Sequence, residues 1–314
     1  MNTKVKHWGI VLLMVVAALL MAGYAIGAYF VDFALKRGND NDPLAPPAAC
    51  AYIQDKNLTV PPEPIALKET WSAISSDNRH LAATHFSTAR TGKRWAILIH
   101  GYGMNQHYAG DYTEVYLQNG YQVLTPDLCA SGETDGQYIT MGVKESEEIA
   151  VWTRKIKEQY PDAEIVLHGV SMGAATALMA AARDDIEGVV AVIEDCGYTS
   201  VYEMFSTQLG VLFDLPEFPI MNCIDIVSGI KTGVMLSDAT PIKVMDKIKV
   251  PVLFIHGEAD KLIPPVMMEQ LYDACKAKKE KFIVSGAGHG NSMSTDSKKY
   301  WSGIFDFLAQ AEGN

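Results

Sequence analysis

The sequence predicts an α/β fold in which helices cover both faces of a mostly parallel, doubly wound sheet. From residue 71 onward, short apolar runs rich in β-branched residues alternate with amphipathic stretches, as buried parallel strands and their covering helices require. Of the 314 residues, 48 % are apolar, so the chain can bury a sizeable core and disorder is not the leading interpretation. A long uncharged run near the start predicts one transmembrane helix ahead of the sheet.

The first expected element is a membrane anchor over residues 1–37. Residues 8–31 carry no charged side chain, and these 24 residues would form a helix of about 36 Å, enough to cross a hydrocarbon layer of about 30 Å. A cleaved signal peptide is the alternative, because the start is basic and residues 25–27 could form a small-residue cleavage site. The apolar run continues past that position and exceeds the roughly 7–15 residues of a secretory signal, which favours a retained anchor.

The anchor predicts a single-pass protein of the cell membrane. Lys4 and Lys6 before the span are matched by Lys36 and Arg37 after it, so the basic residues give only a weak preference for one orientation. We expect the N-terminus inside and the bulk of the chain outside. The proline-rich residues 38–66 disfavour helix and central strand alike and are expected to form a stalk.

One domain is expected over residues 67–314. Its core strands are short and apolar on both faces, and an antiparallel strand over 81–86 is expected before them. The expected core strands are residues 95–99, 121–125, 164–168, 189–193, 251–255 and 281–284. The expected helices are residues 146–159, 172–182, 265–276 and 298–311.

A G-x-S-x-G motif, Gly169 to Gly173, joins the strand over 164–168 to the alanine-rich helix that follows. A serine on such a strand-to-helix turn projects its hydroxyl at the tip of the sheet, and the flanking positions must be small so that strand and helix can approach. The motif alone is weak, and a structural turn is the alternative. With a strand before it and a helix after it, we expect Ser171 to be a nucleophile.

A serine hydroxyl needs a base to take its proton and a carboxylate to orient that base. Asp260 follows the strand over 251–255, and His289 follows the strand over 281–284 between two glycines. We therefore expect His289 as the base and Asp260 as its partner. Asp195, which ends the preceding strand, is a competing carboxylate, and His256 is expected to lie in the core or behind the site.

The reaction also requires donors for the oxyanion. The backbone N–H of Met172, directly after the nucleophile at a helix N-terminus, is the first expected donor. The second is the N–H of Tyr102, in the His-Gly-Tyr-Gly loop that follows the strand over 95–99. A plain glycine turn is the alternative for this loop.

Several classes of function are disfavoured by composition. With 26 basic and 37 acidic residues the net charge is −11, which makes nucleic acid an unlikely partner. The five cysteines are scattered without zinc-ligand spacing, so no metal is expected. The sequence at 286–290 is G-x-G-x-G rather than G-x-G-x-x-G, so no nucleotide or other cofactor is expected. Cys129 and Cys196 follow strands and are expected to be small buried apolar groups.

The loop at 100–103, the elbow at 169–175, the Asp260 loop and the Gly-His-Gly at 288–290 together resemble the α/β-hydrolase superfamily. More narrowly, they resemble prolyl-oligopeptidase-like serine hydrolase domains and membrane-anchored bacterial α/β hydrolases. The resemblance covers the chain from about residue 67 and implies a Ser-Asp-His triad with the roles given above. Residues 127–134 depart from the Asp-x-Arg-Gly-His-Gly-x-Ser of many relatives.

The apolar insertion between the strand over 189–193 and Pro251 is expected to form a helical lid, at about residues 198–240. A helix packed into the core without a substrate role is the alternative.

The expected function is hydrolysis of a small carboxylic ester or thioester through an acyl-serine intermediate. A serine peptidase acting on short peptides and a non-catalytic binding module are the alternatives. Peptidase relatives usually gate their site with a propeller, for which the stalk is too short. Because no expected catalytic group precedes Tyr102, removal of residues 1 to about 36 is expected to leave activity intact.

Overall fold

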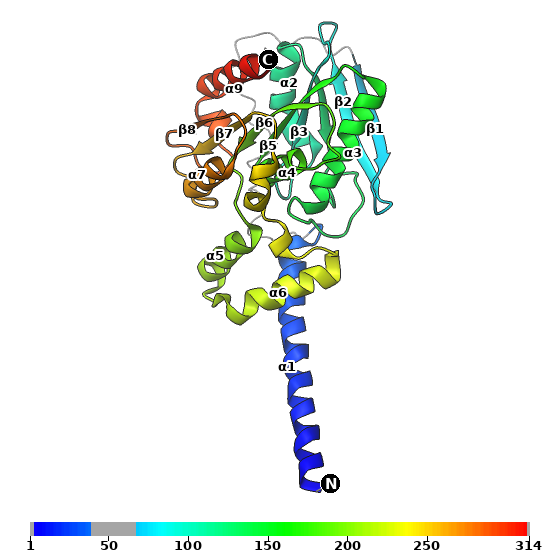
Figure 1. The fold of residues 1–314 in the computed structure, drawn as a ribbon, viewed down its shortest axis with the longest axis vertical. Coiled ribbons are helices and arrows are strands. Elements are labelled where there is room, and N and C mark those ends of the chain that lie inside the picture. Colours follow the sequence, from blue (N-terminus) through cyan, green and yellow to red (C-terminus); the bar gives the residue numbers. More distant parts are fainter. Residues whose placement is uncertain (1–2, 39–66, 313–314) are drawn as a thin grey trace.

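The computed structural model describes residues 3–38 and 67–312, in which one long helix leads into one α/β domain (Figure 1). The stalk predicted over residues 38–66 lies outside the described residues except for Gly38. Helix α1 (Thr3–Leu35) projects from one end of the domain, and the chain ends near α9 at the opposite end. In the described part of the chain, α1 is the one continuous helix long and apolar enough to cross a membrane.

An eight-stranded sheet with the order β1-β2-β4-β3-β5-β6-β7-β8 forms the centre of the domain. The strands are β1 (Leu67–Ile74), β2 (His80–Ser87), β3 (Arg94–Ile99), β4 (Gln122–Pro126), β5 (Glu164–Val170), β6 (Val189–Asp195), β7 (Val252–Gly257) and β8 (Lys279–Val284). The β1–β2 and β2–β4 pairs are antiparallel and every other pair is parallel. The prediction of a mostly parallel sheet is confirmed. Strand β2 is the antiparallel strand predicted over residues 81–86.

Helices cover both faces of this sheet, as the apolar runs on both faces of its strands predict. The helices of the domain are α2 (Gly110–Gln118), α3 (Val143–Gln159), α4 (Met172–Ala181), α7 (Pro265–Ala274), α8 (Ser292–Thr295) and α9 (Ser297–Glu312). Because side chains alternate along a strand, Ile97 of β3 packs with α3, α4 and α7 on one face, whereas Leu98 packs with α2 and α9 on the other.

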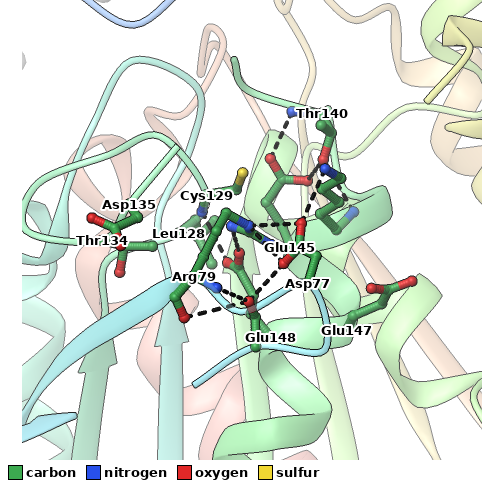
Figure 2. A network of polar contacts seen from close by, with 12 residues as sticks. Asp77, Arg79, Leu128, Cys129, Thr134, Asp135, Thr140, Glu145, Glu147 and Glu148 are labelled. Carbon is green, nitrogen blue, oxygen red and sulfur yellow. Dashed lines mark hydrogen bonds and ion pairs between the residues drawn. The ribbon is translucent and has the colours of Figure 1, made fainter. Parts of the chain in front are cut away.

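A buried polar network fixes the loop that follows β4 (Figure 2). Glu148 of α3 accepts a hydrogen bond from the backbone N–H of Cys129 at 2.9 Å and pairs with Arg79 from the β1–β2 turn. Glu145 accepts from the backbone N–H and the hydroxyl of Thr140 at 2.8 and 2.6 Å. Burial, together with the negative charge of Glu145, raises the pKa of Glu148 to about 8 although Arg79 opposes the shift. The network thereby joins the β1–β2 turn, the loop after β4 and α3.

The insertion between β6 and β7 contains α5 (Val201–Phe213), α6 (Glu217–Thr232) and the short turns η3 (Leu236–Asp238) and η4 (Pro241–Lys247). Helix α6 packs across the C-terminal part of α1, and both α5 and α6 lie between the domain and the projecting part of α1 (Figure 1). The approach is close, because a Cβ added at Gly27 would lie 2.5 Å from the carbonyl oxygen of Cys223. A glycine is therefore required at this crossing.

The end of α1 is fastened to the domain by hydrogen bonds. The carbonyl oxygen of Leu35 accepts from the backbone N–H of Ile139 at 2.8 Å, and the backbone N–H of Arg37 donates to the carbonyl oxygen of Gln137 at 2.9 Å. The hydroxyl of Tyr138 donates to the carboxylate of Asp32 at 2.7 Å. The C-terminal end of α1 is thus bound directly to the domain.

Candidate active site

Ser171 lies on the turn between β5 and α4, at the carboxyl edge of the sheet. Its φ of +59° is strained for a residue with a side chain. The two flanking glycines explain how the turn closes: a Cβ at Gly169 would lie 2.1 Å from the carbonyl oxygen of Gly173, and a Cβ at Gly173 would lie 2.0 Å from the carbonyl oxygen of Ile99. The local sequence therefore forces the serine hydroxyl outward at the end of the strand.

His289, in the loop between β8 and α8, contacts Ser171 and Asp260 at the same time. Its Nε2 lies 2.8 Å from the Oγ of Ser171, and its Nδ1 lies 2.8 Å from the Oδ2 of Asp260. The imidazole is partly exposed, whereas the carboxylate of Asp260 is buried. The three side chains predicted from the sequence form one hydrogen-bonded chain, although they stand on three different loops.

Asp260 is held as a carboxylate by donors on both of its oxygens. Oδ1 accepts from the backbone N–H groups of Leu262 and Ile263, each at 2.9 Å. Oδ2 accepts from His289 and lies 3.3 Å from the Nε2 of His256. Burial opposes the charged form, but the hydrogen bonds from the two histidines outweigh it and hold the pKa of Asp260 well below its usual range. The group is therefore ionised at neutral pH.

Asp195, the competing carboxylate, faces other partners. Its Oδ1 accepts from the hydroxyl of Ser292 at 3.1 Å and its Oδ2 accepts from the hydroxyl of Tyr300 at 2.9 Å. Its backbone carbonyl accepts from the N–H of Ser171 at 2.8 Å, and burial raises the pKa of its side chain to about 6. Asp195 thus supports the turn that carries Ser171, and Asp260 is the carboxylate that accepts the hydrogen bond from His289.

His256 is more closely tied to the site than its sequence context predicts. Its ring is buried, and its Nε2 donates to the carbonyl oxygen of Ile263 at 2.8 Å while also facing Asp260. Burial opposes protonation, but Asp260 and the charge of Glu194 outweigh it and raise the pKa of His256. Within the described residues, Nδ1 of His256 and Oε2 of Glu194 are buried without a hydrogen-bond partner. The spacing His256-x-x-x-Asp260 across the end of β7 is the sequence signal for this contact.

The two expected oxyanion donors belong to segments next to the nucleophile. Met172 is the first residue of α4, where backbone N–H groups have no partner within the helix. The loop before Tyr102 reaches Ser171, since a Cβ added at Gly101 would lie 3.6 Å from the Cβ of Ser171. His100 holds this loop: its ring bonds the carbonyl oxygen of Gly101 at 2.8 Å through Nδ1 and accepts from the N–H of Leu128 at 3.1 Å through Nε2.

Tyr102 also connects the site to α1. Its phenol hydroxyl donates to the backbone carbonyl oxygen of Ala34, in the last turn of α1. No sequence pattern predicts this contact, which joins residues 68 positions apart. The loop beside the nucleophile is consequently positioned by the end of the N-terminal helix.

The thiol of Cys196 lies next to the same group of side chains. Its sulfur and one ligand atom each from Asp260 and His289 lie within 4.8 Å of one another. Burial raises the pKa of Cys196 well above its ordinary value, so the sulfur remains a thiol. A metal ion at this point would have to displace the hydrogen bond between Asp260 and His289, so these atoms serve the hydrogen-bonded chain better than a metal.

Residues 111–314, which include Ser171, Asp260 and His289, match the model of the Prolyl oligopeptidase family. The chain belongs to this family. The resemblance predicted from the sequence motifs is confirmed. An uncharacterized protein of Bacillus subtilis, YqkD, is 29 % identical over 213 residues, which are 68 % of this chain and 70 % of the relative. An uncharacterized membrane protein of Saccharomyces cerevisiae, YNL320W, is 26 % identical over 245 residues, covering 77 % of this chain and 80 % of the relative.

Comparison with solved structures confirms that this chain has the α/β-hydrolase fold. The esterase Pf2001 of Pyrococcus furiosus superposes with a TM-score of 0.64 at 21 % identity, covering 78 % of this chain and 91 % of the esterase. At this identity the likeness establishes the fold, and the chemistry has to be argued from the residues of the site.

Proposed function

We propose that the protein is a serine hydrolase that cleaves carboxylic esters or thioesters through an acyl intermediate on Ser171. The observation that carries the proposal is the continuous hydrogen-bonded chain from Ser171 through His289 to Asp260. A nucleophile, a base within 2.8 Å of it and a carboxylate orienting that base are the three parts that acyl transfer requires.

In the proposed reaction, His289 Nε2 takes the proton of the Ser171 hydroxyl as Oγ attacks the substrate carbonyl. The ionised Asp260 stabilises the imidazolium, and the N–H groups of Met172 and Tyr102 stabilise the oxyanion. Collapse of the tetrahedral intermediate breaks the bond to the alcohol or thiol, which takes the proton from His289. Water then attacks the acyl-serine with His289 again as base, and the carboxylic acid leaves.

Peptide hydrolysis is the second candidate, and the family to which the chain belongs favours it. The same three residues would act, but the leaving group is an amine, which must receive its proton from His289 before it can depart. A panel of soluble acyl esters, acyl thioesters and short peptide anilides separates the two candidates by their kcat/KM values.

Covalent labelling tests the assignment of the nucleophile. We expect a fluorophosphonate to label the full-length protein in detergent and to leave Ser171→Ala unlabelled, with kcat lowered by about 10⁴-fold or more. Ser294→Ala is the matched control, because Ser294 is an exposed serine of α8 whose hydroxyl donates to the backbone carbonyl of Asn291 at 3.2 Å. Labelling of Ser171→Ala would refute the proposal, and an inert wild-type protein would favour the non-catalytic binding module.

We further propose that residues 1–37 anchor the chain in the cell membrane, that residues 38–66 form the stalk, and that residues 67–314 form the catalytic domain outside the cell. The length and apolar character of α1 support the anchor. N-terminal sequencing of the membrane fraction tests retention, and a mature chain that begins near Ala28 would refute it. Digestion of the domain by protease added to intact cells is expected, and protection would refute the outward orientation.

A further inference from the structure

The insertion between β6 and β7 exposes several large apolar side chains. Five residues at the end of α5 and along α6 have exposed fractions between 44 % and 77 %. These residues, which we name the α5–α6 apolar face, are Val211, Leu212, Phe218, Ile226 and Ile230. Ile226 and Ile230 stand one helical turn apart and so form a stripe on the outside of α6. Large exposed apolar residues gathered on one short insertion in this way are typical of a contact surface.

Other side chains of the insertion are packed firmly against α1. Met221, Ile224 and Val227 of α6 are buried in the same core cluster as Val31 and Leu35 of α1. The exposed face is thus held in one orientation relative to α1.

The position of α6 along α1 gives its depth relative to a bilayer. If the hydrocarbon layer begins at Trp8, about 20 residues of helix cross about 30 Å and bring the chain to Gly27. Gly27 is the residue that α6 crosses at the backbone of Cys223. The ion pair between Asp32 and Lys231 lies beyond this point toward the domain. The crossing therefore falls at the boundary of the hydrocarbon layer.

The nucleophile lies at the edge of the sheet from which this insertion leaves. Helix α5 begins six residues after Asp195, which ends β6 at the carboxyl edge of the sheet, the edge that carries Ser171. Tyr102, beside Ser171, is bonded to the last turn of α1. The turn that carries Ser171, the start of the insertion and the contact with the end of α1 therefore lie at one edge of the sheet.

We propose that the α5–α6 apolar face docks into the surface of the bilayer that α1 crosses, and that the enzyme takes acyl esters whose acyl chains reside in that leaflet. The substrate class rests on the proposed function, whereas the docking does not. Continuity with α1 selects lipid as the occupant rather than a second protein. The insertion carries Glu203, Asp214 and Glu217, and its one lysine in α5 or α6 pairs with Asp32, so apolar burial and not charge drives the docking.

Spin labels on the full-length protein in phosphatidylcholine nanodiscs test the docking. Phe218→Cys and Ile226→Cys place the label on the α5–α6 apolar face. Asp162→Cys places it in the exposed turn before β5, at the opposite edge of the sheet. The unmodified chain serves as the labelling blank. We expect labels at 218 and 226 to be accessible to oxygen and shielded from a nickel chelate at both low and high salt, and the label at 162 to be accessible to nickel. Nickel access at all three positions would overturn the proposal, and exclusion of both reagents at 218 and 226 would replace lipid with a protein contact.

Charged substitutions test the substrate class. Ile226→Glu with Ile230→Glu is expected to lower hydrolysis of a long-chain ester presented in vesicles by about tenfold or more and to leave a soluble short-chain ester within about twofold of wild type. Val266→Glu on α7 is the matched control, because Val266 is 57 % exposed and Ile226 is 58 % exposed. Equal rates of the double variant and the control on the vesicle ester would overturn the proposed substrate class. Failure of the wild type on both esters would refute the proposed function, while the spin labels would still decide the docking.

Discussion

Replacement of Asp260 by asparagine separates the orienting role of this carboxylate from its structural role. Oδ1 of Asp260 accepts two backbone hydrogen bonds, from Leu262 and Ile263, so the amide oxygen of Asp260→Asn must take that place. The amide NH₂ then replaces Oδ2 and faces the Nδ1 of His289 as a donor. His289 can accept this bond only with its proton on Nε2, the nitrogen that lies 2.8 Å from the Oγ of Ser171.

The magnitude follows from the wrong tautomer. A histidine protonated on Nε2 cannot take the proton of Ser171, and an Asp-to-Asn change with intact geometry in a triad costs about 10⁴-fold in kcat, or about 5 kcal/mol in activation free energy. The NH₂ also faces the Nε2–H of His256, an unfavourable meeting of two donors. We therefore expect kcat to fall by about 10⁴-fold or more with KM for a short ester nearly unchanged.

Steady-state and burst kinetics with a short p-nitrophenyl ester measure this effect, and Asp195→Asn is the matched control. Asp195 accepts from two hydroxyl groups, of Ser292 and Tyr300, so its asparagine variant is expected to lose about 1–3 kcal/mol of stability and to keep kcat within about tenfold of wild type. If Asp195→Asn were the inactive variant while Asp260→Asn turned over normally, the assignment of the carboxylate would be wrong.

Three further predictions concern the surroundings of the site. Gly173→Ala is expected to prevent correct folding, because its Cβ would lie 2.0 Å from the carbonyl oxygen of Ile99; a wild-type melting temperature would contradict this. His256→Gln is expected to lower kcat by about 10- to 100-fold through loss of a charge-assisted hydrogen bond to Asp260, and to shift the lower limb of the pH–rate profile, which a purely structural change would leave in place. Burial raises the pKa of Glu194 to about 8, so the folded state binds its proton more tightly than the unfolded state does and the free energy of unfolding falls as pH rises from about 5 to about 8. Denaturant titrations across this range should show Glu194→Gln to have the flatter profile, by at most about 1.4 kcal/mol per pH unit, and parallel profiles would refute the assignment.

The central strands could be predicted because burial on both faces leaves a direct mark in the sequence. Strands β3 and β5 are apolar at nearly every position, and the residues that follow such strands necessarily meet at one edge of the sheet. This is why Ser171, Asp260 and His289 could be selected from loops far apart in the chain. Their hydrogen bonds depend on loop geometry, which the sequence pattern does not encode.

The edge strand of the sheet has a weaker sequence pattern than the central strands. Strand β1 is exposed at six of its eight positions and partly exposed at a seventh, and its polar sequence resembles that of a loop. The sequence analysis does not predict helix α2, because its buried face combines Tyr112, Thr113 and Tyr116 with only two aliphatic residues and shows no regular aliphatic stripe. In both cases pairing or packing with the rest of the domain, and not local preference, decides the structure.

The attachment of α1 to the domain changes one expectation drawn from the sequence. The absence of catalytic groups before Tyr102 suggests that residues 1–36 can be removed without loss of activity. In the structure, Val31 and Leu35 are fully buried, and the carbonyl oxygen of Ala34 holds the phenol of Tyr102. Loss of two such buried side chains alone costs about 3–6 kcal/mol, against a total stability of about 5–15 kcal/mol for an ordinary domain.

We therefore expect the two ends of α1 to differ in a truncation series. Deletion of residues 1–22, which are exposed where their side chains are described, should preserve the melting temperature and the hydrolysis of a short soluble ester in detergent. Deletion of residues 1–36 should lower both, because it uncovers Met221, Ile224 and Val227 of α6 and releases the loop beside Ser171. Equal stability and activity of the two truncated proteins would show that α1 is only a tether. A difference between them would mean that the C-terminal turns of α1 form part of the catalytic domain, so that one helix both anchors the enzyme and sets the orientation of its active site.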